Sequence, residues 1–466
     1  MQLYNSLTRQ VEELKTHEPG KVKMYTCGPT VYHFAHIGNL RSYLMEDVLE
    51  KSLRYLGFDV KRVMNITDVG HLTSDADTGD DKMVEGAKRE HKTVKEIAKF
   101  YEEAFQSDCS QLNIKWPEIV VPATEYIDHF IQFIEVLLEK GYAYIAGENV
   151  YFDTSKLERY YVFGNHEEEE LLVGVRDDVE ADENKKNKSD FVLWFTKSKF
   201  EQQALKWDSP WGVGYPGWHI ECSSIAIGNL GEYLDLHCGG IDNMFPHHTN
   251  EIAQSEAYLG HPWCTAWFHV HHLNDKSGKM SKSKGGFLTV SKLKEEGFDP
   301  LSYRLFCLQS HYRKPLEFSW DVLKEMESTY KKLIARVQKL SKDGIVEEVK
   351  EKEYRNRFAD AIGSDLNTSM AITILYDLLK DNEVNDATKR SIIEGFDSVL
   401  SLNLLQEAKS VEVEEGLAAY VEQKLEERKA AKIAKDFALA DAIREELALK
   451  GVTIKDTREG TIWSMK

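Results

Sequence analysis

The chain has no long apolar run, and this absence argues against a helical membrane protein. No hydrophobic stretch among its 466 residues approaches the roughly 20 residues that a helix needs to cross a bilayer. Residues 1–6 carry neither a basic start nor an apolar core, so we expect no secretion signal. Cysteine is sparse, with six residues and no disulfide-scaffold density, as is typical of a reducing compartment. We therefore expect a cytoplasmic protein with no membrane partner.

A basic excess is missing too, because 59 Lys and Arg residues stand against 78 Asp and Glu residues, for a net charge of −19. Proteins that bind nucleic acid through overall charge usually carry a positive domain, so we expect any RNA contact to be a local patch. The chain has two acid-rich segments, at residues 167–170 and 177–190, which we interpret as solvated loops. The length and the 42 % hydrophobic content predict about three to five domains.

Two distant motifs indicate an ATP site. His36-Ile37-Gly38-Asn39 follows a predicted strand over residues 22–26 and a break at Cys27-Gly28-Pro29, and apolar residues then recur at helical spacing up to Gly57. Such a helix start offers backbone N–H groups and a positive dipole end to phosphate. Much later, Lys279-Met280-Ser281-Lys282-Ser283 lies between glycines, so its lysines could neutralise departing pyrophosphate.

A second candidate site combines Cys27, Cys222, His247 and Glu251. His247 and Glu251 are four residues apart, which places both on one face of a helix. We expect the two cysteines at strand ends that border one cleft, with a further strand over residues 234–242. Two thiolates, an imidazole and a carboxylate suit zinc. Each residue alone also fits ordinary packing, and no Cys-x-x-Cys pair enforces a metal site.

The two ATP motifs, in this order, resemble the signatures of class I aminoacyl-tRNA synthetases. Further matching segments extend the resemblance to the cysteinyl-tRNA synthetases, at residues 25–32, 65–69, 207–212, 216–223 and 239–255. The resemblance implies an α/β fold with a Rossmann-like parallel-sheet catalytic domain. It also implies that the substrates are L-cysteine, ATP with Mg²⁺ and tRNA(Cys), that the protein is a monomer, and that one Zn²⁺ per chain binds the substrate thiolate.

The resemblance assigns roles to individual residues. The implied zinc ligands are Cys27, Cys222, His247 and Glu251, and the implied catalytic residues are His36, Asn39, Lys279 and Lys282. The implied ATP-binding residues are His36, Gly38, Asn39, Asp242 and Lys282. The implied cysteine-binding residues are Gly28, Thr67 and Trp218. The chain departs from the family at Asn39, where a second histidine is usual, although an amide can still donate a hydrogen bond. It also inserts a polar loop at residues 70–79. A cluster of His269, His271 and His272 fits a second metal, ordinary cleft packing or substrate contacts.

The resemblance also predicts the domain order. The catalytic domain takes residues 1–125 and 214–260, a connective insertion 126–213, a stem-contact region with the lysine motif 261–319, a tRNA-binding helical bundle 320–405, and a small anticodon-binding domain 406–466. In the last of these, Asp456, Arg458 and Trp463 are candidate contacts to unpaired bases. The insertion is too short for a large editing domain.

Three alternatives stay open. A ligase of the mycothiol pathway would join cysteine to an aminosugar, but the helical C-terminal regions argue against it. A catalytically silent tRNA-binding paralogue would not need the lysine motif or the complete zinc set. A generic nucleotidyltransferase would not need so long a helical tail.

Overall fold

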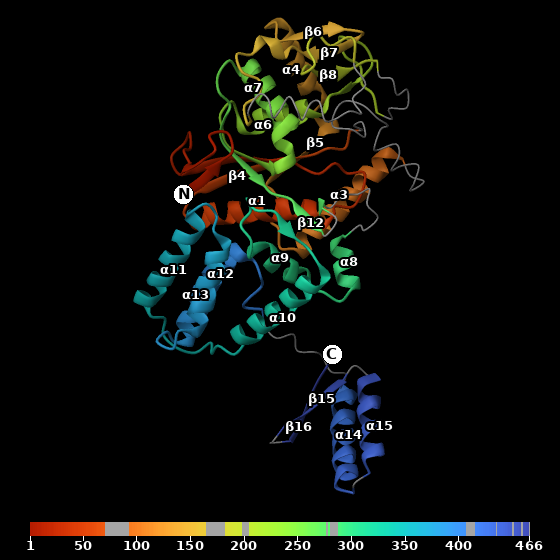
Figure 1. Cartoon of the computed structure of the whole chain (residues 1–466), viewed down its shortest axis with the longest axis vertical. Coiled ribbons are helices and arrows are strands. Elements are labelled where there is room, and N and C mark those ends of the chain that lie inside the picture. The colour runs from red at the N-terminus through yellow and green to blue at the C-terminus, as the bar shows by residue number, and fades with distance from the viewer. Residues whose placement is uncertain are drawn as a thin grey trace. The chain divides into compact units, whose positions relative to one another are not determined.

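The computed structural model describes most of the chain (Figure 1). The described residues are 1–69, 93–164, 182–197, 205–275, 278–279, 288–406, 415–434, 436–449, 452–457 and 460–465. They form two compact units, residues 1–405 and 406–466. The polar loop predicted at residues 70–79 lies outside the described residues, as do Lys282 and Arg458.

A five-stranded parallel sheet forms the centre of the first unit, which confirms the predicted α/β class. The strand order is β11-β10-β3-β4-β5, and every neighbouring pair runs parallel. The strands are β3 (Lys21–Thr26), β4 (Asp59–Ile66), β5 (Ile119–Pro122), β10 (Leu234–Gly240) and β11 (Cys264–Val270). Strand β11 lies beyond residue 260, so the sheet extends past the predicted domain boundary, because this buried apolar segment pairs with β10.

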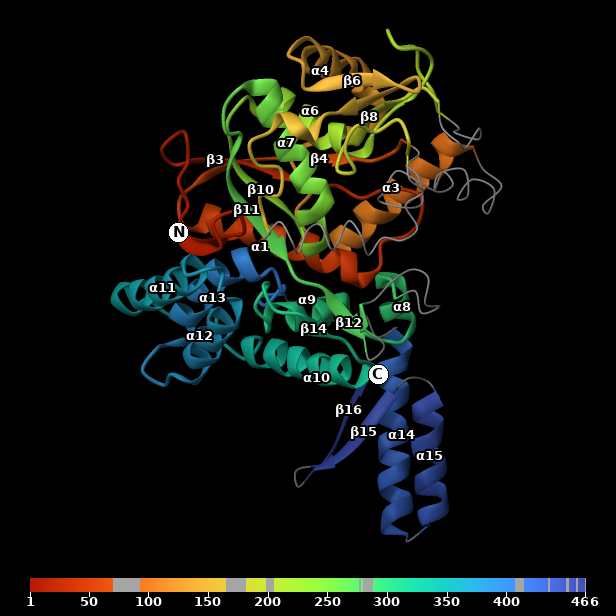
Figure 2. The same cartoon turned by 45° about the horizontal axis from the view of Figure 1, so that its top comes forward.

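Helices cover both faces of the sheet, and each face has its own hydrophobic core (Figure 2). On one face, α1 (Ile37–Tyr55) and α3 (Val94–Gln111) pack with Met24 and Met64. On the other face, α4 (Ile127–Glu139), α6 (Trp218–Leu230) and α7 (Thr249–Leu259) pack with Tyr25 and Val63. The side chains of adjacent strand residues thus pack into opposite cores, because successive side chains point to opposite faces of a sheet.

The predicted insertion, residues 126–213, supplies three strands of a four-stranded antiparallel sheet, and the fourth strand follows just after it. Its strands pair in chain order as β6 (Ala143–Ala146), β7 (Asn149–Phe152), β8 (Phe191–Phe195) and β9 (Tyr215–Pro216). Strand β9 leads through Gly217 into α6, which returns the chain to the central sheet. A hairpin of β1 (Gln2–Asn5) and β2 (Gln10–Glu13) precedes the first strand of that sheet.

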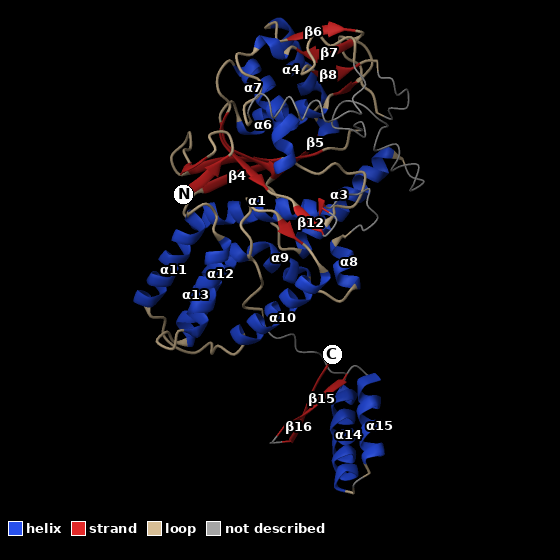
Figure 3. Ribbon diagram, in the orientation of Figure 1, coloured by secondary structure: helices blue, strands red, loops and turns tan. Residues whose placement is uncertain are grey.

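A three-stranded sheet and a helical bundle complete the first unit (Figure 3). Strand β12 (Leu273–Asp275) pairs antiparallel with β13 (Gly278–Lys279) and parallel with β14 (Leu316–Glu317). The helices are α8 (Val290–Glu295), α9 (Pro300–Leu308), α10 (Trp320–Val337), α11 (Glu348–Gly363), α12 (Thr368–Lys380) and α13 (Asp386–Leu400). The apolar faces of α10 to α13 join the core of α1, as their helical periodicity predicts.

The second unit is a helical hairpin followed by a β-hairpin. It consists of α14 (Glu415–Ile433), α15 (Phe437–Leu449), β15 (Val452–Thr457) and β16 (Gly460–Met465). Val421, Ile443 and Leu447 form its small core with Val452 and Ile454. Asp456 and Trp463 lie on the two paired strands. No described helix is both long and apolar enough to cross a membrane.

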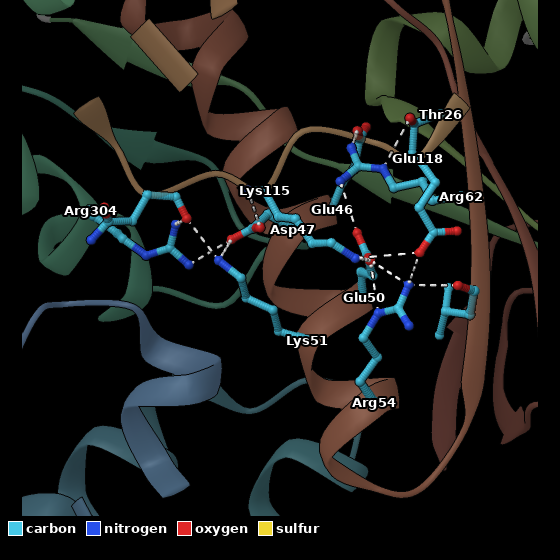
Figure 4. A network of polar contacts seen from close by, with 12 residues as sticks. Thr26, Glu46, Asp47, Glu50, Lys51, Arg54, Arg62, Lys115, Glu118 and Arg304 are labelled. Carbon is cyan, nitrogen blue, oxygen red and sulfur yellow. Dashed lines mark hydrogen bonds and ion pairs between the residues drawn. The ribbon is translucent and has the colours of Figure 1, made fainter. Parts of the chain in front are cut away.

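A buried ionic network fixes α1 between the sheet and α9 (Figure 4). Arg62 of β4 lies 3.4 Å from carboxylate oxygens of both Glu46 and Glu50 on α1. On the other side of the helix, Arg304 of α9 pairs with Asp47 at 2.8 Å. Because removing one partner leaves an uncompensated buried charge, these pairs constrain how α1 can move.

The buried carboxyl of Glu46 predicts a pH dependence of stability. Burial raises the pKa of Glu46 from 4.5 to about 7, although Arg62 opposes the shift. The folded state therefore holds the proton more tightly, and this stabilisation is complete below pH 4.5 and lost as pH rises through about 7. In the parent protein the free energy of unfolding should fall by about 3 kcal/mol over this pH range, and Glu46→Gln should not show this fall. Unfolding free energies at pH 5 and pH 8 would test this, and parallel pH profiles of both proteins would contradict it.

Candidate active site

The turn between β3 and α1 places a histidine at the start of a helix. His36 is the N-cap of α1, and its Nδ1 accepts a hydrogen bond from the backbone N–H of Asn39 at 3.1 Å. This acceptor role leaves the proton of a neutral ring on Nε2, so Nε2 is a hydrogen-bond donor. His36 therefore caps the helix with one nitrogen and can donate to a phosphate oxygen with the other.

The ends of β3 and β4 are joined by the side chain of Asn65. Its Oδ1 accepts from the backbone N–H of Gly28 at 2.7 Å and from Tyr25 Oη at 3.1 Å. Its Nδ2 donates to Thr67 Oγ1, which in turn donates to Glu221 Oε2 at 2.8 Å. A Cβ at Gly28 would lie 1.6 Å from the carbonyl oxygen of Asn65, so this close approach requires glycine. The hydroxyl of Thr67 is thus held by a buried network.

The four predicted metal ligands come from three separate segments. Cys27 follows β3, whereas His247 lies in a single π-type turn, η4 (Met244–His248), that continues into α7 with Glu251. The prediction that Cys222 lies at a strand end is wrong. The strand stops at Pro216, and Cys222 lies in α6, because Gly217 ends the extended segment and Ile220 begins a helical apolar pattern.

The structure brings these four side chains together. One ligand atom from each lies within 4.8 Å of the others, and all four residues are buried. The Sγ atoms of Cys27 and Cys222 are 3.9 Å apart, and Cys222 Sγ lies 3.5 Å from His247 Nε2. His247 Nε2 is also 2.9 Å from Glu251 Oε1. These donor atoms lie close enough together to bind a single metal ion.

The buried groups of the cluster shift one another's pKa values. Burial opposes charge at His247, but Glu251 and Cys222 outweigh it and raise the pKa of His247 to about 10. Burial would likewise raise the pKa of Glu251, but the imidazoles of His237 and His247 lower it to about 2. Burial also opposes a thiolate at Cys222, yet the contacts with Cys27 and His247 lower its pKa. A proton on His247 thus balances anions that a metal ion would otherwise balance.

Two histidines outside the predicted ligand set also contact the cluster. His237 on β10 places Nε2 2.7 Å from Glu251 Oε2, and His248 Nε2 lies 3.3 Å from Cys27 Sγ. Together with Cys27 and Glu251 they form a second set of suitably placed ligand atoms. His248 follows a predicted ligand directly, and this adjacency was the only sequence signal for it. For His237 no such signal existed, because its contact depends on strand register.

The predicted cluster of His269, His271 and His272 has other contacts. His269 joins His248 Nδ1 at 2.8 Å to Ser6 Oγ at 2.7 Å. His271 Nδ1 accepts from the backbone N–H of His272, whose Nδ1 lies 3.6 Å from Asp242 Oδ1. Among the described residues, His269, His271 and His272 do not converge as a ligand set. This arrangement fits the packing interpretation of the cluster.

One cavity of about 240 Å³ joins the ATP motif to the cysteine pair. The predicted site residues that line it are Cys27, Gly28, His36, Gly38, Asn39, Thr67, Trp218, Cys222, Asp242 and His247. Glu251 lies behind this wall and is fully buried. The Trp218 and His247 rings, which both line the cavity, pack at a tilt with their centroids 4.4 Å apart. Lys279 contributes its backbone to β13, while Lys282 lies outside the described residues.

Comparison with known proteins identifies the family. Residues 13–328 match the family model described as the class I (C) tRNA synthetase catalytic domain. A cysteine–tRNA ligase of Treponema denticola is 43 % identical over 99 % of this chain and 99 % of its own length. The chain belongs to the cysteinyl-tRNA synthetase family. Another relative, a cysteine–tRNA ligase of Borrelia hermsii, is also 43 % identical, over 99 % of this chain and 98 % of its own length.

A solved structure supports the family's fold. Methionyl-tRNA synthetase of Mycobacterium tuberculosis, in complex with methionyl-adenylate, superposes with a TM-score of 0.54 and covers 83 % of this chain and 91 % of that chain. The two sequences are only 14 % identical. At this identity the likeness shows a shared fold, which agrees with the family assignment.

Proposed function

We propose that the chain is a cytoplasmic, monomeric cysteine–tRNA ligase that activates L-cysteine with ATP and transfers it to tRNA(Cys). The observation that carries the proposal is the meeting of Cys27, Cys222 and His247 in the cavity that also holds His36. Amino-acid activation and thiol recognition require these two groups of residues side by side.

Cys27, Cys222, His247 and Glu251 would hold one zinc ion. The donor set of two sulfur atoms, one nitrogen and one oxygen suits zinc, and its ligand atoms lie close enough together to share one ion. Bound there, zinc supplies a centre that prefers a thiolate to a protonated hydroxyl. Thr67, Gly28 and Trp218 would line the space for the rest of the amino acid, since all three border the same cavity.

Activation would take place between this pocket and the start of α1. The cysteine carboxylate attacks the α-phosphorus of ATP, a P–O bond forms, and the bond to pyrophosphate breaks. The Nε2–H of His36 and the N–H groups at the helix start would stabilise the added negative charge. Asn39 and Gly38 would border the phosphates, Asp242 the nucleoside, and Lys279 and Lys282, with Mg²⁺, the pyrophosphate.

Transfer then requires only orientation and the departure of AMP. A terminal ribose hydroxyl of tRNA attacks the activated carbonyl and an ester forms. The bond between the carbonyl carbon and the phosphate oxygen breaks, and AMP leaves with the hydroxyl proton. The bundle at residues 320–405 and the unit at residues 406–466 would bind the tRNA, with Asp456, Arg458 and Trp463 as base contacts. These helical regions favour tRNA over a small acceptor.

Pyrophosphate exchange and acceptor assays test this proposal. We expect the purified protein to catalyse exchange that depends on cysteine but not on serine, and then to charge tRNA(Cys). Exchange without tRNA charging, together with transfer to an aminosugar, would replace the proposal with a small-molecule ligase. Binding of tRNA without exchange would replace it with a silent RNA-binding protein.

A further inference from the structure

Arg41 is a buried arginine whose guanidinium is bound by backbone carbonyls. It lies in the second turn of α1, shortly after the His36 motif, and it is fully inaccessible. Its Nη1 donates to the carbonyls of His271 at 2.8 Å and His272 at 2.6 Å. Its Nη2 donates to the carbonyls of Lys314 at 2.8 Å and His311 at 3.4 Å. Within the described parts of the chain, no carboxylate pairs with Arg41. Burial lowers the pKa of this guanidinium.

The carbonyls that Arg41 binds belong to two loops that lead into the same small sheet. His271 and His272 connect β11 to β12, whereas His311 and Lys314 lie between α9 and β14. Strands β12 and β14 pair with each other, and β12 also pairs with β13, whose second residue is Lys279. The Arg41 side chain therefore binds both of the loops that lead into this small sheet. The sheet in turn includes Lys279, the first lysine of its motif.

Further contacts at the first turn of α1 reach Leu288, Tyr303 of α9 and Leu273 of β12. The backbone N–H of Ile37 donates to the carbonyl of Leu288 at 2.8 Å, and the Ile37 carbonyl accepts from Tyr303 Oη at 2.7 Å. A Cβ on Gly38 would lie 3.7 Å from the Cβ of Leu273 on β12. The helix that begins at His36 is thus seated directly against the lysine-bearing sheet.

We propose that Arg41 is a positioning residue for adenylate formation: it sets the distance between His36 on α1 and the β12–β13 hairpin. The inference rests on the proposed function and refines it. Arginine suits this task because its planar group offers five donors and can bridge carbonyls of separate loops, whereas a lysine offers one nitrogen. A displacement of about 1 Å between reacting groups can lower a rate about 100-fold, so a weakened bridge should act mainly on the activation step.

The test compares the same substitution at two buried arginines. Arg41→Lys removes the bridge to the small sheet. Arg304→Lys alters a guanidinium of α9 that is equally inaccessible; it binds Asp47 of α1 at 2.8 Å and the carbonyl of Leu400, at the end of α13, at 2.6 Å. Adenylate formation would be measured in single turnover at saturating ATP and cysteine, alongside cysteine affinity, zinc content and melting temperature.

For Arg41→Lys we expect the maximal rate of adenylate formation to fall about 10- to 100-fold, with cysteine affinity and zinc content within about twofold of the parent protein. For Arg304→Lys we expect a lower melting temperature but an activation rate within about threefold. Arg41→Met, which fills similar space without donors, should activate no faster than Arg41→Lys. A parent-like rate in Arg41→Lys, or an equal loss in both lysine variants, would overturn the inference. A parent protein without cysteine-dependent exchange would instead overturn the proposed function, before any variant is compared.

Discussion

Replacing Cys222 with serine is expected to remove the proposed zinc ion and the preference for cysteine together. The substitution replaces one of two sulfur donors with a hydroxyl that keeps its proton at neutral pH and binds zinc poorly. A pocket that relied on shape alone would separate cysteine from serine by only about 1–3 kcal/mol. We therefore expect zinc content to fall from one ion per chain to near zero, and kcat/KM for cysteine to fall on the order of 100-fold or more. Metal analysis and pyrophosphate exchange with both amino acids measure these effects.

Cys264→Ser is the matched control for this experiment. Cys264 is also a buried cysteine, but its Sγ contacts the carbonyl of Ala266 at 3.3 Å and takes no part in either candidate ligand set. A serine hydroxyl can donate to the same carbonyl, so this variant should keep its zinc and its selectivity. Loss of metal in both variants would point to general destabilisation instead of a lost ligand.

The same variant also distinguishes between the two ligand sets. Cys27 and Glu251 belong to both sets, whereas Cys222 and His247 belong to one, and His237 and His248 to the other. If Cys222→Ser kept a full complement of zinc and His248→Gln lost it, the metal would lie between Cys27 and the second pair of histidines. We expect the reverse result, because Cys222 and His247 border the open cavity, where a substrate thiol can reach the ion.

The sequence predicted the class of the fold through its resemblance to class I aminoacyl-tRNA synthetases. The strand over residues 22–26 and the helix after His36 followed from local hydrophobic spacing. The spacing of His247 and Glu251 also determines which face of the helix they share. These features are local, and the structure retains them.

Other features of the site depend on tertiary packing that no local pattern encodes. Helix α6 is buried on nearly all sides, so the segment around Cys222 lacks the polar stripe that distinguishes an amphipathic helix from a buried strand. The contact of His237 with Glu251 depends on the register between β10 and its neighbours. Arg41 looked like an ordinary charged residue of a helix, because its partners are carbonyls from loops more than 200 residues away in sequence.

Replacing His36 should have the largest effect on activation itself, and two substitutions can separate its two roles. His36→Ala loses both the N-cap acceptor and the Nε2–H donor, whereas His36→Asn keeps an oxygen that can accept from the backbone N–H of Asn39. We expect both variants to lower single-turnover adenylate formation by about 100- to 1000-fold, since one preorganised donor to a charged transition state is worth that much. Only the alanine variant should also lose about 1 kcal/mol of stability from the missing cap. An asparagine variant that forms adenylate at the parent rate would reduce His36 to a helix cap and would leave the positive end of α1 as the main stabiliser of the transition state.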